Sequence, residues 1–274
     1  MKPAKFEYHA AGSPTDALAL LDRLGKGGKI IAGGQSMGPM MNLRVARPEA
    51  VVDIAGAAEL RAVMDEGDSV LIGACVTHGQ IEDGDVSDPS QGMLPHVAGG
   101  IAYRAVRNRG TIGGSMVHAD PAADWVTALI ALGARIDILG PDGRRSVPAE
   151  DFILSAYTVS LADGELVTAI RLPRTSAQAS WGYTKLSRKV GEFADAIGAV
   201  VIDPTKRFCR VVLGGLDGRP CLLHETAKAI AKGERGELPE LIRKEIERRL
   251  PQAAPDRKQI YGVALNRAAA SAIG

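Results

Sequence analysis

The chain has few aromatic residues, almost no net charge and no long apolar run. Phenylalanine, tryptophan and tyrosine make up 4% of its 274 residues, and the formal net charge is +1. Neither a basic surface nor an aromatic platform for bases is indicated, so we expect no nucleic-acid partner. No run of about 18 uncharged apolar residues occurs, and the first residues lack the apolar core of a leader peptide. We therefore expect a cytoplasmic protein without a transmembrane segment.

Cysteine is scarce, and the three cysteines stand far apart. Cys75, Cys209 and Cys221 form no C-x-x-C pair, so the sequence predicts neither a disulfide framework nor a local zinc or iron–sulfur site. His118 and Asp120 alone are too few to complete a metal coordination shell. The five histidines form no triad-like cluster in the sequence. We therefore predict no metal site and no catalytic side chain.

Apolar periodicity and turn residues divide the chain into three parts and predict an α+β fold. We expect an α/β part over residues 1–55, an α+β part over 56–175 and a C-terminal part over 176–274. In the first part a helix in "SPTDALALLDRLG" precedes strands in "GKIIAGG" and "AVVDI". The second part combines strands with two helices, in "LPHVAGGIAYRAV" and "DPAADWVTALIALG". The third part combines three strands in a meander with two closing amphipathic helices.

Two glycine pairs, each preceded by an apolar run, are the main candidates for a ligand site. Gly33 and Gly34 lie in "IIAGGQS", and Gly113 and Gly114 lie in "GTIGGS". Backbone N–H groups in such turns can bind a phosphate, and two turns on opposite sides can bind a pyrophosphate. Gly-Gly-Ser is also common in plain surface turns, so both interpretations stay open here. Nearby side chains could add donors or positive charge: Ser36, Thr111, Ser115, Arg104, Arg107 and Arg109.

Two widespread phosphate-binding motifs do not fit the first glycine pair. A Rossmann loop needs G-x-G-x-x-G at the start of a helix, whereas Gly33 and Gly34 are followed by Gly38 and then Pro39. Asp53 stands about where a Rossmann ribose-binding acid would, but a carboxylate at the end of a strand explains it better. A Walker loop is excluded because no G-K-[ST] triplet occurs.

Several motifs in order carry a resemblance to a known family. "AGGQS", "MMNLR" and "VVDI" are followed by "RNRGTIGGSMVHADPAADW", which is the most specific of them. The chain resembles the FAD-binding medium subunits, or domains, of molybdenum hydroxylases, including those of carbon monoxide dehydrogenase and xanthine dehydrogenase. The resemblance covers nearly the whole chain. It implies a two-subdomain FAD-binding fold of the PCMH type, followed by a C-terminal domain with a three-stranded antiparallel sheet and helices.

The resemblance also implies which residues bind FAD. Two segments match pyrophosphate loops, Asp124 matches a carboxylate on the ribityl or ribose hydroxyls, and Lys185 matches a lysine near the flavin. Asp124 could equally favour the start of a helix through the dipole. Phe193 stands where relatives often carry tyrosine beside the isoalloxazine. The implied cofactor-binding residues are Ile30, Ile31, Ala32, Gly33, Gly34, Gln35, Ser36, Met37, Thr111, Ile112, Gly113, Gly114, Ser115, Asp124, Val167, Lys185 and Phe193.

The family's chemistry implies partners. Its enzymes oxidise their substrate at a molybdopterin cofactor on a large subunit and pass electrons through two [2Fe–2S] clusters on a small subunit. Non-covalent FAD on the medium subunit then passes the electrons to an external acceptor. We therefore expect a heterotrimeric unit, paired as a dimer of heterotrimers, in which this chain is the electron-transfer flavoprotein. Two alternatives are a stand-alone FAD-dependent reductase of related fold and a non-catalytic nucleotide-binding module.

Overall fold

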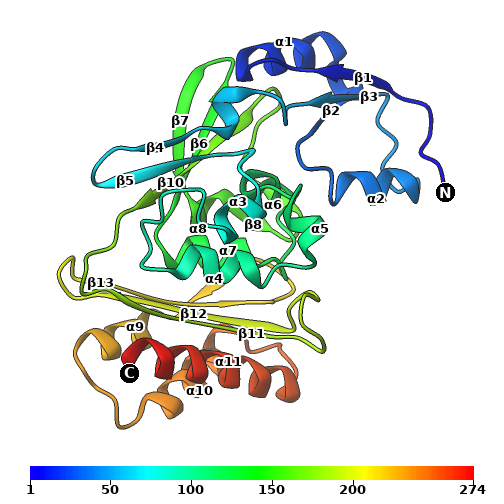
Figure 1. Ribbon diagram of the computed structural model, residues 1–274. Helices are drawn as coiled ribbons and strands as arrows, with labels where there is room; N and C mark the ends of the chain where they lie inside the picture. The colour runs from blue at the N-terminus through cyan, green and yellow to red at the C-terminus, as the bar shows by residue number, and fades with distance from the viewer.

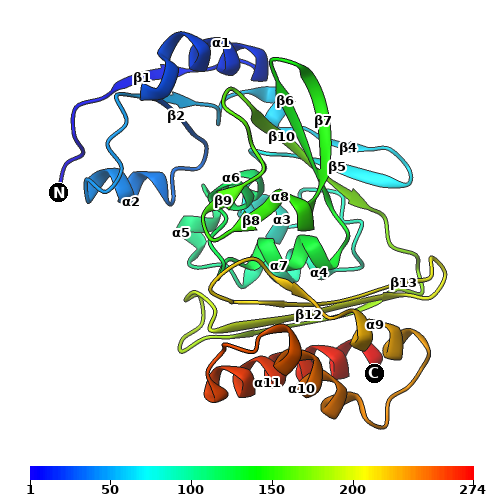
Figure 2. The ribbon, with the colours of Figure 1, turned by 180° about the vertical axis from the view of Figure 1, so that it is seen from behind.

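The computed structural model describes all residues from 1 to 274 and stacks them in three layers (Figure 1). The first layer is a small sheet carrying helix α1, and the second is a larger sheet with short helices beside it. The third is a long sheet with three helices on its outer side. The view from behind shows the same order, with the N-terminal segment and helix α2 extending away from the second layer (Figure 2).

The first layer is a three-stranded parallel sheet in the order β1-β3-β2. Ser13 caps helix α1 by accepting a hydrogen bond from the Asp16 amide, and Pro14 occupies the first turn. Leu18, Leu21 and Leu24 of α1 pack against the sheet, as the periodicity predicts. The elements are β1 (Glu7–Ala10), α1 (Pro14–Leu24), η1 (Gly25–Gly27), β2 (Gly28–Ile31), α2 (Met37–Asn42) and β3 (Ala50–Asp53).

The second layer is a five-stranded antiparallel sheet in the order β4-β5-β10-β6-β7. A separate two-strand hairpin, β8-β9, lies beside the helices. The strands are β4 (Val63–Asp65), β5 (Ser69–Gly73), β6 (Arg135–Gly140), β7 (Gly143–Pro148), β8 (Ile153–Ser155), β9 (Thr158–Val159) and β10 (Leu166–Pro173). The helices are η2 (Ala58–Arg61), α3 (His78–Glu82), α4 (Met93–Gly99), α5 (Arg104–Arg107), α6 (Ile112–His118), α7 (Asp124–Ala131) and α8 (Ala149–Phe152).

The third layer is a four-stranded antiparallel sheet in the order β11-β12-β13-β14. Its strands are β11 (Ser180–Leu186), β12 (Ala196–Asp203), β13 (Phe208–Gly214) and β14 (Cys221–Leu222). Its helices are α9 (His224–Ala231), α10 (Leu238–Arg249) and α11 (Pro255–Ile273). The three predicted strands and two closing helices are present as β11, β12, β13, α10 and α11. The two-residue strand β14 and helix α9 were not predicted, because neither is long enough to show a period in the sequence.

Two further segments differ from the sequence-based expectation. The single helix predicted in "LPHVAGGIAYRAV" is two helices, α4 and α5, because the chain turns at Gly100 and Ala102 has a φ of 42°. The segment "GTIGGS", predicted as a glycine-rich turn, instead starts helix α6. None of the helices combines the length and the apolar character that crossing a bilayer requires.

Strand β12 is buried on both faces and joins two apolar cores. Ala199 and Val201 belong to the large core of the second layer, whereas Ala196 and Val200 belong to the core beneath helices α9, α10 and α11. Because successive side chains of a strand point to opposite faces, "AIGAVVID" can be apolar almost throughout. The third-layer sheet is therefore held between helices of the second layer and its own helices (Figure 1).

Two glycines let helix α11 approach the sheet closely. A Cβ on Gly182 of β11 would lie 1.9 Å from the Ala268 carbonyl oxygen, and a Cβ on Gly198 of β12 would lie 2.4 Å from that of Ala264. These distances leave no room for a methyl group, so the helix backbone rests directly on the strands. Strand β11 also carries Tyr183 and Lys185, whose positions therefore depend on this contact.

We expect Gly182→Ala to lower the free energy of unfolding by about 1–3 kcal/mol, because the added methyl group displaces α11 from the sheet. Gly262→Ala, in α11 itself, is the matched control. A Cβ there meets nothing within 4 Å, so the helix should gain up to about 1 kcal/mol. Urea unfolding of both variants measures the difference, and equal stabilities would contradict the proposed close approach.

Candidate functional site

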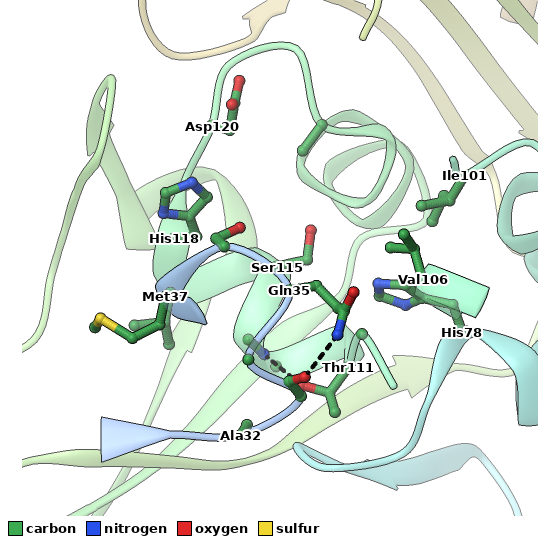
Figure 3. A pocket seen from close by; sticks show the side chains of 18 of the residues that line it. Ala32, Gln35, Met37, His78, Ile101, Val106, Thr111, Ser115, His118 and Asp120 are labelled. Atoms are coloured by element: carbon green, nitrogen blue, oxygen red, sulfur yellow. Dashed lines mark hydrogen bonds between the residues drawn. The ribbon is translucent and has the colours of Figure 1, made fainter. Parts of the chain in front are cut away.

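A cavity of about 450 Å³ lies where segments of all three layers meet. Its wall combines the loop after β2, helix α6, the start of β10, strand β11 and the loop that follows β11. Figure 3 shows the loop after β2 beside helix α6. Every residue of the implied cofactor set lines this cavity except Ile112, whose side chain is fully buried in the second-layer core.

The loop after β2 presents a run of open backbone donors. The amide N–H groups of residues 33 to 37 donate no hydrogen bond within the chain. Gly34 has a φ of 70°, a left-handed conformation that glycine adopts without strain, and it lets the chain turn toward the cavity. Gln35 Nε2 donates to the Gly33 carbonyl at 3.1 Å and stiffens the turn. Such a turn of unpaired N–H groups is suited to an anion.

Gly33 is required for a different reason from Gly34, namely a close contact between two backbone segments. A Cβ at this position would lie 1.9 Å from the Arg109 carbonyl oxygen, so the loop after β2 touches the segment before helix α6 through backbone atoms alone. The first glycine of the pair therefore brings the two segments together, and the second provides the turn. A side chain on Gly33 would separate the two walls of the cavity.

The second glycine pair does not offer free amides. Thr111 caps helix α6, and its Oγ1 accepts from the Gly114 amide at 3.1 Å. The amides of Ile112, Gly113 and Ser115 donate to backbone carbonyls of Val76, Ala74 and Thr111. A Cβ on Gly113 would lie 2.5 Å from that of Ala74, so this glycine serves helix packing. What the segment presents to the cavity is therefore hydroxyl groups, and Figure 3 shows Ser115 directed into it.

A buried ion pair forms the cavity wall between the second and third layers. Lys185 Nζ lies 2.8 Å from Asp124 Oδ2, and Tyr183 donates its hydroxyl proton to Asp124 Oδ1 at 2.7 Å. Burial raises the pKa of Asp124, which is 5% exposed, while the Lys185 ammonium and the two hydrogen bonds oppose the rise. Burial, followed by the nearby Asp124 charge, raises the pKa of Tyr183 well above its usual value.

The ion pair shows more than a helix-dipole role for Asp124 and more than a solvated position for Lys185. Asp124 is the first residue of α7, as the helix-dipole interpretation requires, yet its carboxylate is also paired across the layers. Lys185 is not a solvated strand residue, because its side chain is 13% exposed. Its ammonium also donates to the Gly100 carbonyl at 3.3 Å, in the turn that separates α4 from α5.

The arginines before helix α6 support the cavity from outside it. Arg104 and Arg107 pair with Glu82, and Arg107 also donates to the carbonyls of Ile101 and Ala102 at 3.0 Å. Neither arginine lines the cavity, nor does Arg109. Of the three, only the Arg107 guanidinium bonds to the turn between α4 and α5, and a role of these arginines as cavity cations is not supported.

The mouth of the cavity is apolar and exposed. Phe193 lies in the loop between β11 and β12 and is 69% exposed, although it lines the cavity. Gly191 of the same loop packs on the Ala102 carbonyl, where a Cβ would be 2.9 Å away. Val167 is buried deeper, on strand β10 beside an irregularity in its pairing with β6. An aromatic ring at the mouth and an aliphatic side chain further inside suit a flat apolar ligand group.

Sequence reasoning missed one buried polar residue of the wall. His78, the first residue of α3, is 5% exposed, and its Nδ1 accepts from the Trp125 indole N–H at 3.0 Å. Burial, together with the Arg107 charge, lowers the pKa of His78 to about 4. Leu161, Glu165 and Leu166, which precede or begin β10, also line the cavity. No pattern in the sequence distinguishes these positions from core or turn residues.

Comparison with known proteins identifies the family. Residues 4–175 match the family described as "FAD binding domain in molybdopterin dehydrogenase". The carbon monoxide dehydrogenase medium chain of Hydrogenophaga pseudoflava is 42% identical over 202 residues, which cover 74% of this chain and 70% of the relative. The nicotine 6-hydroxylase medium subunit of Paenarthrobacter nicotinovorans is 35% identical over 222 residues, 80% of this chain and 77% of the relative.

Solved structures match over the full length. A carbon monoxide dehydrogenase chain from Hydrogenophaga pseudoflava, in a form that lacks the Mo-pyranopterin moiety of its molybdenum cofactor, superposes with a TM-score of 0.91. The two chains share 34% identity, and the match covers 99% of this chain and 98% of the other. Quinoline 2-oxidoreductase from Pseudomonas putida 86 gives a TM-score of 0.83 at 26% identity, with 100% of each chain covered.

The expected fold class is confirmed by these structures, and the expected assignment to a flavoprotein component of molybdenum hydroxylase-type oxidoreductases is confirmed with it. The family match extends over both glycine pairs, and the structural match extends to the C-terminal helices. This chain belongs to the family of FAD-binding medium subunits of molybdenum hydroxylases.

Proposed function

We propose that the cavity binds FAD non-covalently and that the chain transfers electrons from a partner's [2Fe–2S] clusters to an external acceptor. The observation that carries this proposal is the run of open amides at residues 33 to 37, which lines the same cavity as hydroxyl groups of the α6 segment. Five unpaired N–H groups beside Ser36 and Ser115 suit a pyrophosphate, which accepts hydrogen bonds on every side.

The rest of the wall suits the two ends of FAD. Phe193 and Val167 offer the apolar surfaces on which an isoalloxazine ring can rest. Lys185 provides a positive charge near the ring, and Asp124 an acceptor for ribityl or ribose hydroxyls. When bound, FAD supplies the redox chemistry by accepting two electrons and releasing them. The chain contributes the binding, the orientation and the electrostatic environment, so it needs no nucleophile or general acid of its own.

The proposed partners are a small iron–sulfur subunit and a large molybdenum-cofactor subunit, assembled as a dimer of heterotrimers. Phe193, which lines the cavity, is exposed, and so are two apolar neighbours of other lining residues: Val190, which precedes Gly191 and is 96% exposed, and Tyr103, which follows Ala102 and is 72% exposed. Such exposed apolar side chains favour burial against a partner close to the flavin. Free cysteines fit a cytoplasmic location, which we include in the proposal.

The domain boundaries of the chain are part of the same proposal. We assign the first FAD subdomain to residues 1–55, the second to 56–175 and the C-terminal domain to 176–274. The three main sheets support this division, because each takes its strands from one of these ranges. The C-terminal part nevertheless contributes Lys185 and Phe193 to the cavity, so FAD binding should depend on all three.

Purification tests the function as a whole. The isolated chain should show the visible absorption of a flavin and should release all of it on denaturation, while oxidising no substrate alone. Recovered from its native cell under mild conditions, it should bring two further subunits with iron and molybdenum. Nucleotide bound without flavin colour would support the nucleotide-binding module. Substrate turnover by the chain alone would support the stand-alone reductase.

Ser115 tests the pyrophosphate site without straining the backbone. Ser115→Asp should weaken FAD binding by roughly 10- to 1,000-fold, because a carboxylate about 4 Å from a phosphate is repelled by about 1–4 kcal/mol. Ser115→Asn, a neutral side chain of nearly the same size, is the control and should bind FAD far better. Titration of the apoprotein with FAD by fluorescence measures both. Equal affinities would argue against phosphate at this position.

Variants of Asp124 and Lys185 distinguish a purely structural role of this ion pair from a role in binding the cofactor. Lys185→Met should lower the free energy of unfolding by about 3–5 kcal/mol, because it leaves a buried carboxylate unpaired and raises the pKa of Asp124 further. The double variant Asp124→Asn/Lys185→Met should recover most of that stability, since no buried charge remains. If these groups also contact FAD, the double variant should still bind it at least about tenfold more weakly. Wild-type affinity there would leave the pair only a structural role.

A further inference from the structure

His78 is a buried polar group that the proposed binding of FAD does not yet use. Its backbone N–H donates to the Gly110 carbonyl at 2.9 Å, which places the first turn of α3 against the cavity wall. Trp125, itself fully buried, donates its indole proton to His78 Nδ1 at 3.0 Å. A Cβ on Gly110 would lie 2.8 Å from His78 Nε2, so Gly110 leaves the room that the ring occupies.

The Trp125 contact decides which ring nitrogen carries the proton. An indole N–H only donates, so His78 Nδ1 must accept, and the neutral ring then carries its proton on Nε2. Protonation of Nδ1 is disfavoured because it would set two donors against each other inside the core. The His78 side chain is therefore a neutral donor with one N–H, on the nitrogen opposite the one that Trp125 holds.

The Nε2–H group has no acceptor in the chain, yet it is not sealed inside the protein. The only fully enclosed side-chain atoms without a partner are Thr127 Oγ1 and Glu150 Oε2. His78 lines the cavity, and Figure 3 shows its ring beside Val106 and Ile101 and directed toward Gln35. A donor that is held so firmly and left without a partner needs an acceptor from outside the chain.

We propose that His78 Nε2–H donates a hydrogen bond to an acceptor atom on the flavin half of the bound cofactor and thereby positions it. This rests on the proposed binding of FAD. The flavin half is indicated because two residues beside His78, Trp125 and Ile101, adjoin the Lys185 end of the cavity. Trp125 follows Asp124, the partner of Lys185, and Ile101 follows Gly100, whose carbonyl accepts from Lys185.

Nuclear magnetic resonance of the histidine ring tests the donor directly. In the ¹⁵N-labelled chain Nε2 should be protonated and Nδ1 unprotonated at pH 7. Adding FAD should move the Nε2–H resonance and slow its exchange with water, whereas ADP should leave the resonance in place. No response to FAD, or an equal response to ADP, would overturn the proposal. A wild-type chain that takes up no FAD at all would instead refute the proposed function.

Variants separate a positioning role from a merely structural one. His78→Phe removes the donor and should weaken FAD binding by about tenfold, the scale of one hydrogen bond lost, while His78→Gln restores an N–H and should lie within about threefold of wild type. Both His78→Phe and Trp125→Phe remove the hydrogen bond between Trp125 and His78, but Trp125→Phe keeps the imidazole. The loss of FAD affinity in Trp125→Phe should therefore be clearly smaller than that in His78→Phe. Equal losses in the two phenylalanine variants, without rescue by glutamine, would mean that the pair only supports the fold.

Discussion

The ion pair between Asp124 and Lys185 is the contact on which the cavity depends. It joins the first residue of α7, in the second layer, to Lys185 near the C-terminal end of strand β11, in the third. Through Lys185 it also reaches the Gly100 carbonyl, and so the turn between α4 and α5. Three segments far apart in the sequence are thus held around one charge pair. Because both groups are largely buried, neither can be lost without leaving the other uncompensated.

The packing behind this pair sets its geometry. Helix α11 rests on Gly182 and Gly198 with no side chain between them, and strand β12 is filled with apolar residues on both faces. Strand β11 therefore has little freedom to move toward or away from α7. On the opposite wall, Gly33 brings the loop after β2 into backbone contact with Arg109. Both walls are positioned by glycines that allow close approach rather than by long side chains that fill space.

Much of the architecture could be predicted from the sequence. Leu18, Leu21 and Leu24 showed the period of a helix, and the apolar run "AIGAVVI" indicated a strand of the C-terminal meander. The motifs around Gly33 and Thr111 were specific enough to indicate the family and most of the cavity wall. Periodicity could not show that Gly100 and Ala102 break a helix, nor that the amides after Thr111 are used within α6. Those outcomes depend on partners distant in sequence, such as Ala74 and Lys185.

By itself the sequence determined the order of the elements, the apolar faces and the family, because each of these follows from local pattern or from motifs kept in order. Only the tertiary structure decided which glycine serves the turn and which serves the contact between loops. It also decided that Lys185 is paired rather than solvated, and that His78 holds its proton on Nε2. The reason is physical: hydrogen bonds, burial and charge depend on which groups meet in space, and a residue's neighbours in the sequence do not specify them.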